Sequence, residues 1–156
     1  MRRSSTNNQY IKLSLFSLFL VIYQIMTSVY TFLPLFVGVF FAYIIVNYED
    51  EKKKNYIYLI FIYLSFYDLN KGFYLFTYIL LFLIFYNLFV EKIRNFFTCS
   101  NCIIGIYVVV AYLGHFIVNS FIAYILNHDA PIFLFDYFYY IAIDAFFAVI
   151  IFKGKV

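Results

Sequence analysis

The chain has 156 residues, of which 66% are hydrophobic and only 12% are charged, and its net charge is +3. A water-soluble domain of this length needs a polar surface that such a composition cannot supply, so the soluble globular class is excluded. The charges form no basic patch of nucleic-acid character. We therefore expect an integral membrane protein that lies in the lipid bilayer and has no nucleic acid among its partners.

Six hydrophobic segments follow one another along the chain, separated by polar, charged or Pro/Gly-containing breaks. Most are long enough, at about 1.5 Å per residue, to cross about 30 Å of hydrocarbon. They are too long and too evenly apolar for the strands of a β-barrel. The sequence predicts an all-α fold, a polytopic bundle of about six transmembrane helices in one membrane domain over 1–156. The predicted spans are roughly 11–29, 32–47, 55–69, 72–90, 102–126 and 132–152.

The ends of these segments carry further signals. Arg2 and Arg3 before the first segment resemble a signal peptide, but no small-x-small cleavage site follows Met26, so we interpret a retained helix. Pro34 and Pro131 are expected in the first turns of the second and sixth helices, where a missing N–H costs nothing. The third segment, about fifteen residues, is expected to be the shortest span, at little more than 20 Å.

The Lys and Arg residues of the breaks predict the orientation of the bundle. If the chain crosses six times, ten of them fall on one side of the membrane and only Lys71 on the other. By the positive-inside rule, this asymmetry places both termini in the cytoplasm. The ten are Arg2, Arg3, Lys12, Lys52, Lys53, Lys54, Lys92, Arg94, Lys153 and Lys155. The charged run 49–54 is expected to be a solvated loop, with a docking site for a cytoplasmic protein as the alternative.

Three polar residues in the predicted spans are candidates for a functional site, because ionisable groups within hydrocarbon are expensive. His115 and Asn119 lie one helical turn apart on the fifth segment, and Asp144 lies in the middle of the sixth. Asp144 and His115 are expected at similar depth, and we hypothesise that they pair. These groups either hold helices together or form a proton relay or ligand pocket, which Gln24 and Asn87 could join.

The sequence gives no positive support for an enzyme. It contains no phosphate-binding glycine loop, no Ser/His/Asp arrangement and no H-E-x-x-H, so no catalytic residue, cofactor or metal ligand is predicted. Cys99 and Cys102 form a C-x-x-C pair on the reducing cytoplasmic side, without a second pair to complete a zinc site. We expect free thiols there, with a redox or metal role as the alternative.

Two short strings give the chain a resemblance to a known family. Thr31-Phe32-Leu33-Pro34-Leu35-Phe36 follows the first segment, and Tyr67-Asp68-Leu69-Asn70-Lys71-Gly72-Phe73 joins the third to the fourth. With the overall layout, they resemble the MreD family, the small multi-pass inner-membrane proteins of the bacterial rod-shape system. Pro34, Asp68, Leu69 and Gly72 carry the resemblance, while the stretch 62–66 lacks the small residues often found there in the family.

The resemblance implies a non-enzymatic scaffold of the cell-elongation machinery in the bacterial inner membrane. Its implied partners are MreC-like and other elongation-complex membrane proteins, together with the actin-like MreB and the enzymes of peptidoglycan synthesis. The implied fold is similar to that of the substrate-binding subunits of vitamin-uptake transporters. Two alternatives stay open: such a transporter subunit, and an accessory subunit of a respiratory membrane complex. From the residues alone, Asp68 either caps the fourth helix or contacts a partner or Lys71 near the outer surface.

Overall fold

The computed structural model describes residues 3–30 and 33–154, with side chains from Tyr10 onward. The described residues form helices and connections with no strand among them, which confirms the all-α class. A wide π-helical turn, η2, links α4 to α5, so that 77–96 is one continuous helical segment. The elements are α1 (Arg3–Val29), α2 (Val37–Asn47), η1 (Glu51–Lys53), α3 (Lys54–Lys71), α4 (Thr77–Phe85), η2 (Tyr86–Val90), α5 (Glu91–Phe96), α6 (Ser100–Ile125) and α7 (Asp136–Phe152).

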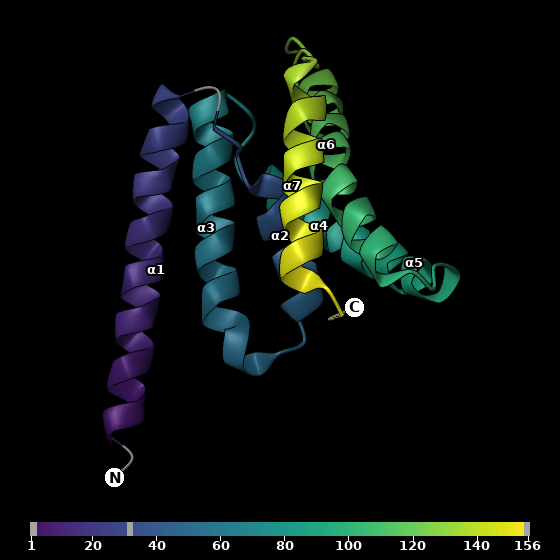
Figure 1. The fold of residues 1–156 in the computed structure, drawn as a ribbon. Helices are drawn as coiled ribbons and strands as arrows, with labels where there is room; N and C mark the ends of the chain where they lie inside the picture. Colours follow the sequence, from purple (N-terminus) through teal and green to yellow (C-terminus); the bar gives the residue numbers. More distant parts are fainter. Residues whose placement is uncertain (1–2, 31–32, 155–156) are drawn as a thin grey trace.

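The helices run alternately up and down, as Figure 1 shows. The start of α1, the α2–α3 connection and the end of α7 lie toward one end of the bundle, and the α1–α2, α3–α4 and α6–α7 connections lie at the other. The short helix α2 packs against α3, α6 and α7, and its inward face is completely buried. α1 lies at the edge and packs along α3, with Leu20 and Thr27 as its buried residues within the described side chains.

Two of the described helices are long and apolar enough to cross a membrane: the part of α1 from Tyr10 to Val29, and α6. A signal sequence close to the amino terminus would meet the same criteria as α1. These two helices therefore give only weak evidence of a membrane protein. The six-span arrangement therefore stays a prediction.

The second segment differs from its prediction because its helix starts late. Residues 33–36 are not helical, and α2 begins at Val37, so Pro34 lies before the helix rather than in its first turn; Thr31 and Phe32 lie outside the described residues. Pro131 likewise precedes α7, which begins at Asp136. The expectation for both prolines was wrong, because several residues of non-helical chain separate each from its helix.

The prediction that the third segment is the shortest was wrong. The 18-residue α3 spans about 27 Å, because its helical hydrogen bonding continues into the polar residues at both ends, whereas the 11-residue α2 spans about 16 Å. Gly72 ends α3 at φ 74°, in the left-handed region, and Phe73 N–H donates to the Asp68 carbonyl at 2.9 Å. This is a Schellman-type end that favours glycine.

α4 starts in the same way as α2. Residues 73–76 of the predicted span 72–90 precede the helix, and Phe76 at φ 65° stands immediately before Thr77, as Phe36 at φ 51° stands before Val37. A left-handed conformation costs a residue with a side chain roughly 1–2 kcal/mol. Both helices also begin in the interior, since Val37 is completely buried and Thr77 is only 1% exposed. The polar ends of two helices therefore lie inside an apolar bundle.

The charged run 49–54 is an ordered turn. The Asp50 carboxylate accepts from Lys52 N–H at 3.1 Å and lies 3.3 Å from the Lys53 ammonium, and these contacts hold the pKa of Asp50 below its usual value. Lys53 also donates to Asn47 Oδ1 at the end of α2. The contacts are those expected of a solvated loop that fixes the ends of α2 and α3.

Close packing at Gly38 predicts a large effect of a single methyl group. A Cβ at this position would lie 2.6 Å from Val108 Cγ1 and 3.1 Å from Asp144 Oδ2. We expect Gly38→Ala to lower the free energy of unfolding by about 1–3 kcal/mol through overpacking. Thermal unfolding in detergent, followed by circular dichroism, measures this.

Gly105→Ala in α6 is the matched control, because a Cβ there meets no atom within 4 Å. It should leave stability unchanged or raise it by up to about 1 kcal/mol through helix propensity. Equal melting temperatures for the two variants would contradict the packing described here.

Candidate functional site

Four of the sequence-predicted polar residues lie in the interior of the bundle. Asp68 on α3, His115 and Asn119 on α6, and Asp144 on α7 are each at most 3% exposed. Of the other residues that carry the family resemblance, Leu69 is 57% exposed, Gly72 ends α3, and Pro34 lies in the segment that leads into α2. The interior residues do not form one cluster, but two hydrogen-bonded groups.

The first group joins α3 to α6 through Asp68 and His115. The Nε2 of His115 lies 2.8 Å from Oδ1 of Asp68, in hydrogen-bond contact. The His115 imidazole stacks on the Tyr78 ring, with centroids 3.9 Å apart and planes 10° from parallel, and the Phe73 ring meets it edge-on at 4.8 Å. The aromatic rings exclude water from the pair, so that the two side chains must satisfy each other.

Asn119 extends this group to the chain that leads into α4. Its Oδ1 accepts from Tyr74 N–H at 3.0 Å, and its Nδ2 donates to the His115 carbonyl oxygen at 2.9 Å. The Nδ2 group also lies 3.0 Å from His115 Nε2. The consistent assignment has His115 Nε2–H donate to Asp68 and the Asn119 amide donate to the carbonyl, since one nitrogen cannot donate and accept in these directions together.

The second group joins α7 to α2 and α6 through Asp144. Oδ2 of Asp144 accepts from the Tyr112 hydroxyl at 2.7 Å and from the backbone N–H of Gly38 at 2.8 Å. The hypothesised Asp144–His115 pair is therefore wrong. Similar depth does not make two side chains partners, because the rotation of α6 turns His115 toward α3 and Tyr112 toward α7.

Both carboxyl groups lie at the interior helix starts. Gly38, which donates its N–H to Asp144, is in the first turn of α2, and the Asp68 carboxyl lies near Thr77 and Tyr78 in the first turn of α4. The first N–H groups of a helix have no partner within it, and the helix dipole favours negative charge there. The recorded hydrogen bond of Asp68 goes to His115, so the capping interpretation of Asp68 stays a prediction. For α2 the geometry does show a cap, because the Asp144 carboxyl accepts from Gly38 N–H and is supplied by a distant part of the chain.

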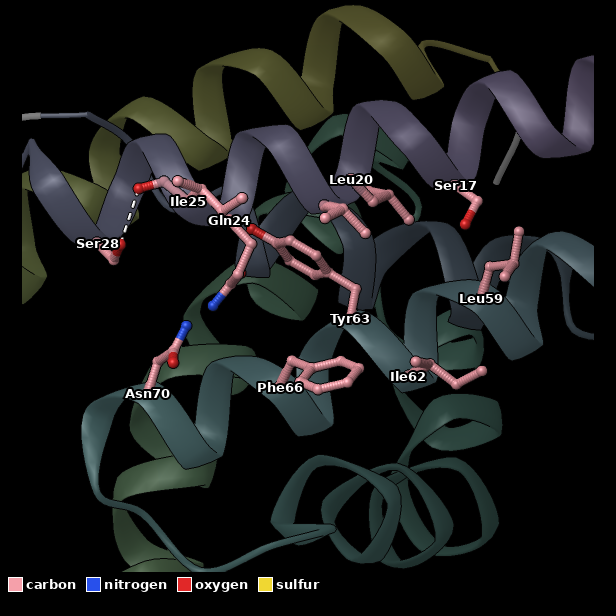
Figure 2. Close-up of a pocket in the computed structure, with 11 residues that line it drawn as sticks. Ser17, Leu20, Gln24, Ile25, Ser28, Leu59, Ile62, Tyr63, Phe66 and Asn70 are labelled. Atoms are coloured by element: carbon pink, nitrogen blue, oxygen red, sulfur yellow. Dashed lines mark hydrogen bonds between the residues drawn. The ribbon is translucent and has the colours of Figure 1, made fainter.

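A groove of about 350 Å³ lies between α1 and α3, away from these two groups (Figure 2). At one end Figure 2 shows the amide tips of Gln24 and Asn70 pointing toward each other, while Ser17 and Leu59 lie toward the other end. Gln24 Oε1 is buried without a hydrogen-bond partner among the described residues. The remaining lining is mainly apolar, from Leu20, Val21, Ile25, Ile62 and Phe66.

Gln24 and Asn87, named with the interior residues, lie elsewhere. Gln24 lines the α1–α3 groove, and Asn87 is exposed and donates to the Leu83 carbonyl on its own helical segment. Asn119 borders a hollow at the end of the bundle that also includes His128, whose Nδ1 lies 3.0 Å from the Tyr74 hydroxyl. The polar residues thus do not converge on one ligand pocket.

Tyr112, Tyr78 and Gly38 belong to the interior groups although the sequence did not single them out. Tyr112 stands three residues before His115, about 60° around the helix from it, so the spacing indicates a neighbour of His115 but not that it faces a different helix. Gly38 stands among bulky residues, which could have indicated close packing there, but nothing in the sequence indicated Asp144 as its hydrogen-bond partner. Nothing in the sequence distinguished Tyr78 from the other tyrosines.

Within the described residues, no group of three or more His, Cys, Asp or Glu side chains could hold a metal ion. Comparisons of the chain with protein families, with curated proteins and with solved structures found no match.

The two hydrogen-bonded groups predict which side chains are coupled. Asp68→Asn and His115→Ala together should destabilise the protein by about 1 kcal/mol less than the sum of the single variants, because each removes the same bond. Asp144→Asn with His115→Ala is the control cycle, and its effects should add within about 0.5 kcal/mol. Unfolding in detergent supplies the free energies. Coupling in the second cycle but not in the first would contradict the pairing described here.

Proposed function

We propose that the chain is a non-enzymatic adaptor of the bacterial inner membrane that crosses it six times with both ends in the cytoplasm. We further propose that it serves the cell-elongation machinery, as its resemblance to the MreD family implies. The observation that carries the adaptor role is that the interior polar groups bond to one another while large apolar side chains face outward along the helices. Such a surface suits lipid and membrane-protein partners better than a soluble substrate.

The arrangement of the helices supports the six crossings. Successive connections alternate between the two ends of the bundle (Figure 1). The turn with Lys52, Lys53 and Lys54 lies at the end where the chain begins, while Lys71 ends α3 at the opposite end. Cationic residues favour the cytoplasmic side. The lysine-rich end is therefore the proposed cytoplasmic end.

The interior contacts favour the adaptor over a ligand-binding transporter subunit. His115 and Asn119 are bonded to α3 and to the chain before α4, and Asp144 is bonded to Tyr112 and Gly38. A ligand in a pocket formed by these side chains would have to break bonds that hold the helices together. The contacts of His115, Asn119 and Asp144 are of the kind by which polar side chains join neighbouring helices in membranes.

The α1–α3 groove is the proposed contact surface for a transmembrane helix of a partner protein. Gln24 Oε1 has no hydrogen-bond partner among the described residues, and Figure 2 shows the amide tips of Gln24 and Asn70 pointing toward each other across the groove. In hydrocarbon, polar side chains of this kind bond across helix interfaces, and small side chains such as Ser17 and Ser28 allow close approach. α1 packs mainly along α3 and leaves most of its outer face exposed, so a second helix can reach the groove from the lipid.

Cysteine labelling tests the proposed orientation. In a variant with Cys99 and Cys102 replaced by Ser, Lys71→Cys should react with a membrane-impermeant maleimide in intact spheroplasts, because it is exposed at the proposed outer end and outside the α1–α3 groove. Glu51→Cys, in the exposed η1 turn at the opposite end, is the control and should react only after lysis. Labelling of both positions, or the reverse pattern, would contradict the orientation.

Cell shape and partner contact test the adaptor role. Loss of the protein should make rod-shaped cells round or wide, and a Gln24→Leu/Asn70→Leu variant should fail to restore the shape and co-purify about tenfold less MreC-like partner. A tenfold loss corresponds to about 1.4 kcal/mol of contact energy, the size of one or two membrane hydrogen bonds.

Asn87→Leu is the matched control, because it removes an exposed amide from another part of the bundle, and it should restore normal shape. Normal cell shape without the protein would rule out the elongation role. Normal shape and co-purification with the double variant would rule out the groove as the contact.

A further inference from the structure

The C-x-x-C pair stands at the start of α6, at the end of the bundle proposed to face the cytoplasm. Cys99 is the residue before the helix, with φ −87° and ψ 105°, and Cys102 lies in its first turn, with its N–H donating to the Cys99 carbonyl at 3.1 Å. Both side chains are exposed free thiols. This is the position that reactive cysteines occupy in dithiol proteins, where the first cysteine lies at a helix N-terminus.

The surroundings of the Cys99 sulfur favour its thiolate. The neighbouring Cys102 thiol and the backbone N–H groups of Cys102 and Asn101 lower the pKa of Cys99 below its ordinary value. α6 has 26 residues, so its N-terminal dipole acts in the same direction. Cys99 is therefore the better nucleophile of the pair at neutral pH.

The two cysteines are also close enough to form a disulfide. Positions three apart in a helical turn have Cα atoms about 5 Å apart. This separation falls within the range of about 4.4–6.8 Å found for disulfide-bonded cysteines. The hydrogen bond from Cys102 N–H to the Cys99 carbonyl holds the two residues in this turn.

We propose that Cys99 and Cys102 form a redox-active dithiol that exchanges with thiol disulfides of the glutathione class, with Cys99 as the attacking residue. The Cys99 thiolate attacks one sulfur of the disulfide RSSR, forming a mixed disulfide and releasing RS⁻, which takes up a proton. The Cys102 thiol then loses its proton, and its thiolate attacks the Cys99 sulfur and expels the second RS⁻. One RSSR is reduced to two RSH, and the pair is oxidised to an intramolecular disulfide.

A reducing cytoplasm is compatible with this role. The absence of a second cysteine pair argues against a structural zinc site, but a dithiol needs only its two sulfurs and an oxidised partner. Reduced glutathione keeps the pair in the dithiol form under ordinary conditions. A rise in the disulfide concentration closes it, so the state of the first turn of α6 follows the redox poise of the compartment.

The test uses the full chain, purified in detergent, with oxidised glutathione as the probe and mass spectrometry of the cysteine-containing peptide as the readout. The wild type should lose two hydrogens and carry no glutathione, because the mixed disulfide resolves. Cys102→Ser should retain one glutathione on Cys99. In the reduced wild type, iodoacetamide should modify Cys99 at least about fivefold faster than Cys102 at pH 7.

Cys99→Ser is the matched control, and Cys102 in this variant should react more slowly with oxidised glutathione than Cys99 does in Cys102→Ser. A stable mixed disulfide in the wild type, or equal alkylation of the two cysteines, would overturn the proposal. These measurements involve neither a partner protein nor cell shape. Their failure would leave the adaptor role standing, and failure of the adaptor role would leave the dithiol standing.

Discussion

The structure depends on how two helix N-termini are satisfied inside an apolar bundle. α2 and α4 begin in the interior, where water cannot bond to their free N–H groups. In an apolar interior an unpaired N–H costs several kcal/mol, so an acceptor has to come from elsewhere in the protein. Asp144 supplies it to Gly38 from the last helix, and Asp68, at the end of α3, lies near the start of α4. The Asp144 carboxyl also gains stabilisation from the helix that it caps.

This constraint fixes the positions of the other helices. Because Asp144 bonds to both Gly38 and Tyr112, α7 cannot slide along α2 or α6 without breaking a buried hydrogen bond. His115 holds α6 to α3 in the same way. The cost of the left-handed residues Phe36 and Phe76 is also explained, since each directs the chain from an extended segment into a helix that starts in the interior. Polar side chains with this structural task are poorly suited to bind an outside ligand.

The sequence was sufficient for the all-α class and for the order of the helices, because hydropathy and segment length depend on the chain alone. It also indicated the turn at Gly72 at the end of α3, which is a local feature. It failed at the start of α2, because a bulky residue such as Phe36 gives no sign of a left-handed conformation and Pro34 suggested an earlier start. It also failed at the partner of His115. Hydropathy gives the depth of a residue, but the rotation of α6, which turns His115 to Asp68 and Tyr112 to Asp144, follows from tertiary packing.

Polar atoms without a hydrogen-bond partner remain both near the edges of the bundle and inside it. Gln24 Oε1, in the α1–α3 groove, and Ser100 Oγ, beside Cys99, are buried without a hydrogen-bond partner among the described residues. The interior also retains three such atoms, the Tyr107 hydroxyl and the second oxygens of Asp68 and Asp144, but these are enclosed. A partner can reach the edge groups without unfolding the bundle, whereas the enclosed groups become accessible only if helices separate. Interactions with other molecules are thus expected at α1 and at the start of α6, and the central carboxylates keep the fold in place while they occur.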